Sequence, residues 1–183
     1  MNTVETTTRR FGRQTIYHPN GKGTGAALQL DMRLNNGDEK RYDCFFLNMV
    51  RQKTVAKRSE GDRAPATFDW ENKVTVKLDF ADICELLTVF KGRKQRPGDG
   101  RGLYHSTGST NTLIDLCKSE EKSGYSLSIS KKNSEGESVF RAQMLLTQAE
   151  SLGLEHILQT SLFFLTFHHN LGLGHDTVQG TAD

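Results

Sequence analysis

The chain has 183 residues, of which 35% are hydrophobic and 25% are charged, so its composition is that of a folded, soluble protein. The longest apolar stretch, Ser161–Phe167, is far shorter than the roughly 20 residues that a membrane-spanning helix needs. The 24 basic and 22 acidic side chains leave a formal net charge of +2, which by itself selects no partner.

The ends of the chain and the cysteines indicate an intracellular location. Residues 1–10 are polar and lack the apolar core of a signal peptide, so we expect a flexible N-terminus. Cys44, Cys84 and Cys117 are odd in number, widely spaced and form no C-x-x-C pair, which favours reduced thiols over a disulfide framework or a zinc site. We therefore predict a cytoplasmic protein, associated with the nucleoid if the source is bacterial.

The first half of the chain, residues 11–92, predicts four strands and then a helix. The strands are expected at Ile16–His18, Ala26–Leu34, Cys44–Gln52 and Lys73–Leu78, with apolar residues alternating along the second and fourth. The residues between the third and fourth strands are basic and poor in apolar side chains, and we expect a long loop there. A helix follows, because Asp79 can cap its start and Gly92 suits its end.

A connector, residues 91–102, carries five basic and one acidic side chain with four glycines and Pro97. The second half, residues 102–169, repeats the first. Its strands are expected at Leu103–His105, Thr112–Lys118, Tyr125–Lys131 and Val139–Leu145. The final helix begins at the capping box Thr147–Glu150. Residues 170–183 are expected to form a flexible tail.

This order predicts an α+β fold in one domain spanning residues 11–169. It has two antiparallel four-stranded sheets, each followed by a helix that covers its apolar face, and the two helices pack together. The last helix is too apolar to be explained by its own sheet, so we expect oligomerisation through it. The residues assigned to that interface are Leu158, Leu162 and Leu165.

The duplicated four-strand-plus-helix plan resembles the Whirly and PC4-like superfamily of proteins that bind single-stranded nucleic acid. Gly21–Leu28 resembles the Lys-Gly-Lys-Ala-Ala-Leu segment that opens the second strand of plant Whirly proteins. Tyr125–Ser130 is similar to their third strand of the second half, and Thr147–Glu150 with Leu158–Phe167 resembles their last helix. The resemblance implies a tetramer built on the helices. It also implies single strands bound along exposed sheet edges between subunits, without strong sequence preference.

Binding of single strands requires cations for phosphates and flat rings for bases. The charge distribution favours the first half and the connector, because residues 103–183 carry five basic and nine acidic side chains. Lys22 lies in a Gly-rich turn whose backbone amides we expect to approach a phosphate closely. The loop before the fourth strand adds Lys57, Arg58 and Arg63 as residues that could wrap a strand. The candidate contact residues are Lys22, Arg33, Phe46, Arg51, Lys53, Lys73, Lys77, Lys131, Lys132 and Arg141.

Three functions remain open at this stage. The first is a DNA-binding protein specific for single strands, acting in replication, repair, recombination or transcription. The second is an RNA-binding and annealing protein with the same fold, since stacking and phosphate contacts do not read the 2′-hydroxyl. The third is a protein-interaction oligomer. We predict no enzyme and no cofactor, because the three cysteines and six histidines form no recognisable nucleophile–base arrangement. We predict no metal site either, because His168, His169, His175 and Asp176 belong to the expected tail.

Overall fold

The structure is a computed structural model that describes residues 12–34, 43–59, 62–120 and 123–167. The expected flexible ends, residues 1–10 and 170–183, lie outside the described residues. So do His168, His169, His175 and Asp176. Within the described ranges, no helix is long and apolar enough to span a membrane.

The first half forms an antiparallel sheet followed by a helix, as predicted. The sheet contains β1 (Gln14–His18), β2 (Ala26–Arg33), β3 (Cys44–Thr54), β7 (Val74–Leu78) and a short added strand, β6 (Thr67–Phe68). β7 pairs with β3, and its buried Val74, Val76 and Leu78 alternate with exposed Thr75 and Lys77. Helix α1 (Phe80–Phe90) follows directly.

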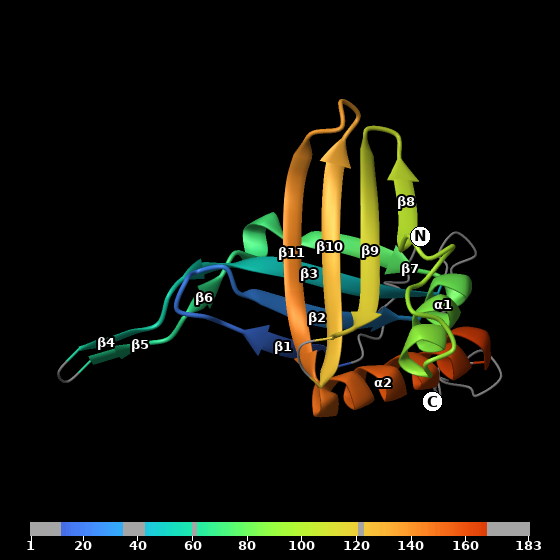
Figure 1. Cartoon of the computed structure of the whole chain (residues 1–183), viewed down its shortest axis with the longest axis horizontal. Coiled ribbons are helices and arrows are strands. Elements are labelled where there is room, and N and C mark those ends of the chain that lie inside the picture. The colour runs from blue at the N-terminus through green and yellow to red at the C-terminus, as the bar shows by residue number, and fades with distance from the viewer. Residues whose placement is uncertain (1–11, 35–42, 60–61, 121–122, 168–183) are drawn as a thin grey trace, which may run out of the picture.

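The second half repeats this plan with four strands. They are β8 (Leu103–Thr107), β9 (Thr110–Lys118), β10 (Gly124–Asn133) and β11 (Ser138–Thr147), in the spatial order β11-β10-β9-β8. Helix α2 (Gln148–Phe167) then runs back along the molecule (Figure 1).

Both helices begin at the predicted caps. Asp79 accepts a hydrogen bond from the amide of Asp82, whose carboxylate accepts one from the amide of Asp79. Thr147 and Glu150 form the same reciprocal box at the start of α2. Gly92 follows the end of α1 with φ of 66°, a conformation that favours glycine.

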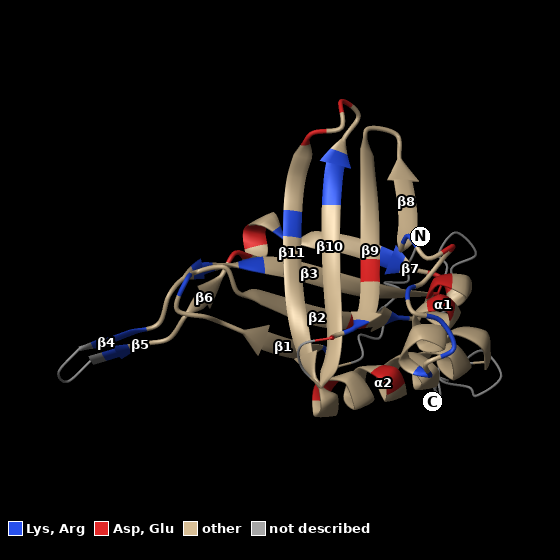
Figure 2. Ribbon diagram, in the orientation of Figure 1, with Lys and Arg blue, Asp and Glu red and all other residues tan. Residues whose placement is uncertain are grey.

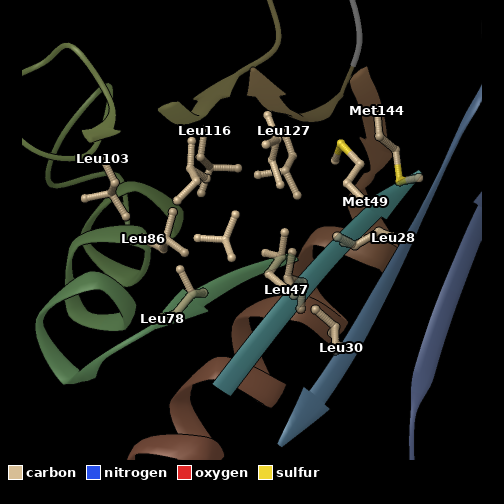
Figure 3. Close-up of a cluster of buried hydrophobic side chains, with 14 of the residues drawn as sticks. Leu28, Leu30, Leu47, Met49, Leu78, Leu86, Leu103, Leu116, Leu127 and Met144 are labelled. Atoms are coloured by element: carbon tan, nitrogen blue, oxygen red, sulfur yellow. The ribbon is translucent and has the colours of Figure 1, made fainter. Parts of the chain in front are cut away.

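The hydrophobic core lies between the two sheets, which corrects the expectation that each helix covers its own sheet. The strands of the second sheet run across those of the first (Figure 1), and β11 packs against β2 and β3. Leu47 and Met49 from the first sheet lie in one cluster with Leu116 and Leu127 from the second and Leu86 from α1 (Figure 3). The helices contact each other, α1 packing on β7 and β9 and α2 on β10 and β11. The sheets therefore bury one another, and the helices complete the core at one side.

The expected loop before β7 is instead largely structured. β4 (Lys57–Ser59) and β5 (Asp62–Ala64) pair as a two-stranded ribbon that projects away from the sheets (Figure 1). β6 and a short 3-10 helix, η1 (Trp70–Asn72), return the chain to β7. These strands are too short to show an apolar alternation, so the sequence pattern gave no sign of them.

Candidate nucleic-acid interface

A polar groove runs between the edge of the second sheet and one end of the first. It has a volume of about 870 Å³ and is bounded by residues 141–145 of β11, the turn between β1 and β2, and residues 51–53 of β3. Three of the predicted contact residues, Arg51, Lys53 and Arg141, line it. Because β11 is the outermost strand of its sheet, the groove follows an exposed sheet edge.

The cations of the groove come from both sheets and are held near each other by packing. The guanidinium carbon of Arg51 lies 5.5 Å from the ring centroid of Phe140, a cation–π contact between β3 and β11. Arg141 follows Phe140 in β11 and is exposed. Lys131 pairs with Phe140 across the second sheet. Because the two sheets cross, Arg51 and Arg141, which are far apart in the sequence, lie in the same groove.

The Gly-rich turn that forms one wall is fixed by Gln52. The side-chain oxygen of Gln52 accepts hydrogen bonds from the amides of Asn20 (2.8 Å) and Gly25 (3.1 Å), and its side-chain nitrogen donates to the carbonyl of Asn20 (2.9 Å). A Cβ at residue 25 would collide with Gln52 and with the carbonyl of His18, which explains the glycine.

Several amides of the turn already have hydrogen-bond partners within it, which disfavours the phosphate contact predicted for them. The amides of Lys22 and Thr24 donate to the side chain of Asn20, and that of Gly23 donates to its carbonyl. Since the amide of Gly25 is also bonded, these donors are already used within the turn. Lys22 is exposed on the turn, outside the lining of the groove, so only its ammonium group remains for an anion.

A second group of predicted residues lies on the outer face of the first sheet. Phe46 is half-buried there, with Lys77 directly opposite on β7 and the guanidinium carbon of Arg33 4.8 Å from its ring centroid. The charge of Arg33 is partly compensated, because Arg33 and Arg13 both pair with the buried carboxylate of Asp31, at 3.3 Å and 3.5 Å. This group is distinct from the groove.

The remaining predicted residues flank the groove or lie beyond it. Lys73 is exposed just before β7, whose first residue pairs with Met49 at the middle of β3. Lys132 is exposed beyond a register shift in β10, and Figure 2 shows basic residues at the far end of this strand. Neither lines the groove.

Sequence reasoning missed an aromatic cluster on the outer face of the first sheet, at the end of the sheet where the groove lies. Tyr17, 54% exposed, lies 5.3 Å from Phe68 and 6.4 Å from Trp70 between ring centroids. Asp69, between these two residues, lines the groove and donates its amide to the carbonyl of Arg51 (2.9 Å). Trp70 is the sole tryptophan of the chain, which was the one available signal. Exposed rings of this kind are platforms on which nucleic-acid bases stack.

Much of the positive charge of the connector is compensated within the fold. Lys91 pairs with Glu155 at 3.1 Å and Lys94 with Glu85 at 2.8 Å. Arg96 pairs with Asp115 at 3.3 Å. These ion pairs fasten the connector to both helices and to β9, so three of its five basic residues serve the fold.

Two histidine–carboxylate pairs join the repeats reciprocally. His18, at the end of β1, contacts Glu150 in the capping box of α2 at 2.9 Å. His105, at the equivalent place in the second half, contacts Asp82 in the capping box of α1 at 3.1 Å. Burial raises the pKa of Glu150, but hydrogen bonds from His18 and Thr147 outweigh it, so this pKa lies below its ordinary value. Each repeat therefore locks the helix start of the other.

The exposed apolar surface of α2 differs from the predicted one. Leu158 is fully buried within the chain, so its assignment to an oligomer interface is wrong. Leu162 and Leu165 are half-buried against the core. Phe163 and Phe167, 50% and 48% exposed, contact each other at 5.5 Å between ring centroids.

Neither a family model nor a curated protein sequence matches the chain. Solved structures do. WHY3 from Arabidopsis thaliana is 17% identical, with a TM-score of 0.67 over 90% of this chain and 94% of that one. The plant transcriptional regulator PBF-2 is 15% identical, with a TM-score of 0.62 over 92% and 88%. A guide-RNA-binding protein complex bound to a guide RNA is 19% identical, with a TM-score of 0.52 over 89% and 94%.

These likenesses establish the fold: the chain has the Whirly and PC4-like architecture that its duplicated pattern predicted. At such low identity the ligand has to be argued from the residues of this chain. Among the side chains that the structure describes, no group of His, Cys, Asp and Glu residues is arranged to hold a metal ion.

Proposed function

We propose that this protein binds single-stranded nucleic acid in the groove between its two sheets. The observation that carries the proposal is the convergence of Arg51 and Arg141 from different sheets in one groove, with the exposed ring of Tyr17 at the same end of the first sheet. Guanidinium groups bind phosphates and exposed rings stack bases, which is the combination that single-strand binding requires.

The groove favours binding with little sequence preference. Sequence is read mainly by hydrogen bonds to base edges, and side-chain amides are among the groups that make them. The amides of Asn20 and Gln52 are engaged within the turn, and that of Gln143 donates to Ser126 at 2.8 Å. Phosphate contacts and stacking remain, and neither distinguishes one base sequence from another.

We propose DNA as the ligand, in replication, repair, recombination or transcription, and a non-catalytic role in the cytoplasm. RNA is the second candidate, supported by the likeness to a complex that holds a guide RNA. An RNA competitor that displaces labelled DNA with higher affinity would assign the protein to the second candidate. A protein that binds neither polymer would belong to the protein-interaction class.

We further propose that a second copy of the chain covers the exposed part of α2. Phe163 and Phe167 leave apolar surface uncovered in the single chain, and the resemblance to Whirly proteins favours a tetramer. Leu162 and Leu165 border this surface from the core side.

The groove is tested by fluorescence anisotropy with a labelled mixed-sequence single strand, titrated at several salt concentrations. Arg51→Ala combined with Arg141→Ala should weaken binding and reduce the slope of log K against log salt by about 1.4, at about 0.7 per lost contact to a single strand. Arg93→Ala combined with Arg101→Ala is the matched control, because it removes the same charge from exposed positions of the connector.

Equal losses in the two double variants would show that net charge, and not the groove, determines affinity. Tyr17→Ala separates stacking from charge. It should lower affinity by about 1–3 kcal/mol, the usual value of one stacked base, without changing the salt slope.

A further inference from the structure

Asp69 is an acidic residue in a groove whose other formally charged side chains are basic. It lies between β6 and η1, and its amide donates to the carbonyl of Arg51 at 2.9 Å. The formally charged residues that line the groove with it are Arg51, Lys53 and Arg141. A carboxylate repels phosphates, so a groove that bound only phosphates would bind them better without Asp69.

The carboxylate of Asp69 is held in place through one of its two oxygens. The side-chain nitrogen of Asn72 donates to Oδ2 of Asp69 at 2.9 Å, and the amide of Asn72 donates to the carbonyl of Asp69 at 3.2 Å. Within the described part of the chain, Oδ1 accepts no hydrogen bond and the carboxylate forms no ion pair. Asp69 is half-buried, so Oδ1 is an acceptor of fixed orientation that a ligand can use.

The arginines and the carboxylate belong to different walls of the groove. Arg51 extends toward β11, where its guanidinium carbon lies 5.5 Å from the ring centroid of Phe140, and Arg141 is the next residue of that strand. Asp69 directly follows β6, which pairs with β3. Phosphates bound by the two arginines therefore follow β11, and the bases of the same strand are left to face Asp69.

The chemistry of Oδ1 selects the part of a nucleotide that it can contact. A carboxylate accepts hydrogen bonds and donates none. Every base carries at least one N–H donor on its Watson–Crick edge, which is an amino group in adenine and cytosine, a ring N–H in thymine and both in guanine. In a single strand these donors are available to a protein, whereas in a duplex they are bonded to the opposite base.

We propose that Asp69 selects single strands by accepting a hydrogen bond from the Watson–Crick edge of a base that lies in the groove. The inference rests on the proposed function and adds to it the group that distinguishes an unpaired base from a paired one. Because all four bases offer a donor, this contact is compatible with little sequence preference. Repulsion between the carboxylate and phosphates acts in the same direction, since it disfavours polyanions without accessible bases.

The test measures fluorescence anisotropy of the wild-type protein and of Asp69→Ala with four DNA probes of about 12 nucleotides, a length within the usual site sizes. The probes are a dC strand, a dT strand, the dC strand in a duplex, and an abasic strand that keeps only sugars and phosphates. Asp69→Ala should lower the preference for the dC strand over the abasic strand about tenfold, the order expected of one hydrogen bond to a charged group. The preference for the dC strand over its duplex should fall similarly, and the dT strand should behave as the dC strand does.

Glu71→Ala is the matched control, because Glu71 is exposed two positions further along and does not line the groove. Thermal unfolding controls for folding, and Asp69→Asn, which keeps the size of the side chain and removes its charge, should lower both preferences as well. Unchanged preferences in the two Asp69 variants, or an equal fall in Glu71→Ala, would overturn the inference and leave the groove intact. A fall confined to dC or to dT would overturn it too, because Asp69 would then read sequence. Failure of the wild-type protein to bind any probe would instead reject the proposed function.

Discussion

Replacing Glu150 by Ala should destabilise the fold by breaking the lock between the two repeats. The carboxylate accepts hydrogen bonds from the amide of Thr147 (2.8 Å) and its hydroxyl (2.9 Å), and contacts His18 Nε2 through both oxygens at 2.9 Å and 3.0 Å. A helix cap contributes about 1 kcal/mol. A hydrogen bond to a charged group contributes about 1.5–3 kcal/mol, and partial exposure places this one at the low end. We therefore expect a loss of about 2–3 kcal/mol.

The assay is reversible thermal unfolding followed by circular dichroism. For a chain of this size, a loss of 1 kcal/mol lowers the midpoint by about 2–4 °C, so the Glu150→Ala variant should unfold about 5–10 °C earlier. Glu155→Ala, in the same helix, is the matched control, because Glu155 forms an ion pair with the exposed Lys91 and such pairs contribute about 0–1 kcal/mol.

A double-mutant cycle with His18→Ala isolates the contact between the repeats. The cycle should give a coupling energy of about 1 kcal/mol or more between His18 and Glu150. Strict additivity, or a Glu150→Ala variant as stable as Glu155→Ala, would refute the reasoning.

Three further predictions concern the Gly-rich turn, the pH dependence of stability and the exposed surface of α2. Gln52→Ala should lower the free energy of unfolding in urea by about 2–4 kcal/mol, because the amides of Asn20 and Gly25 lose their acceptor; a loss below about 0.5 kcal/mol would contradict this account of the turn. The pKa of Glu85 is lowered, mainly by the hydrogen bond from Lys94, and the pKa of Glu150 is lowered as well. Because a carboxylate with a lowered pKa favours the folded state, both groups stabilise the fold at pH values above their ordinary pKa of 4.5. The free energy of unfolding should stay constant from pH 7 to about pH 5 and decline below pH 4.5. The decline should be shallower in a variant in which Glu85 and Glu150 are both replaced by Gln, and identical pH profiles of this variant and the wild-type protein would contradict the prediction. Phe163→Asp should yield a folded protein of lower mass by size exclusion with light scattering, and an assembly of unchanged mass would show that α2 is not the interface.

Much of the secondary structure could be predicted because its signals are local. The alternation in β7 and the caps at Asp79 and Thr147 depend on neighbours in the sequence, and the structure confirms each of them. The same signals say which face of a strand is apolar but not what covers it. The burial of one sheet by the other was therefore not foreseen.

The candidate site could be predicted only in part, because it is assembled from distant segments. Arg51 and Arg141 were predicted separately, and the crossing of the sheets brings them to one groove. Tyr17 and Trp70 are more than fifty positions apart in the sequence, so no local pattern relates their rings. The ion pair of Arg96 with Asp115 is likewise a tertiary contact, and its partner could not be read from composition.

The central claim is that single strands occupy the groove, and the most direct measurement of it compares one labelled DNA oligonucleotide as a single strand and as a duplex. Fluorescence anisotropy at low and moderate salt should show tight, salt-sensitive binding of the single strand and poor binding of the duplex, whose bases are stacked and unavailable to the exposed ring of Tyr17. Binding of the duplex as tight as that of the single strand, or binding of neither at low salt, would contradict the account.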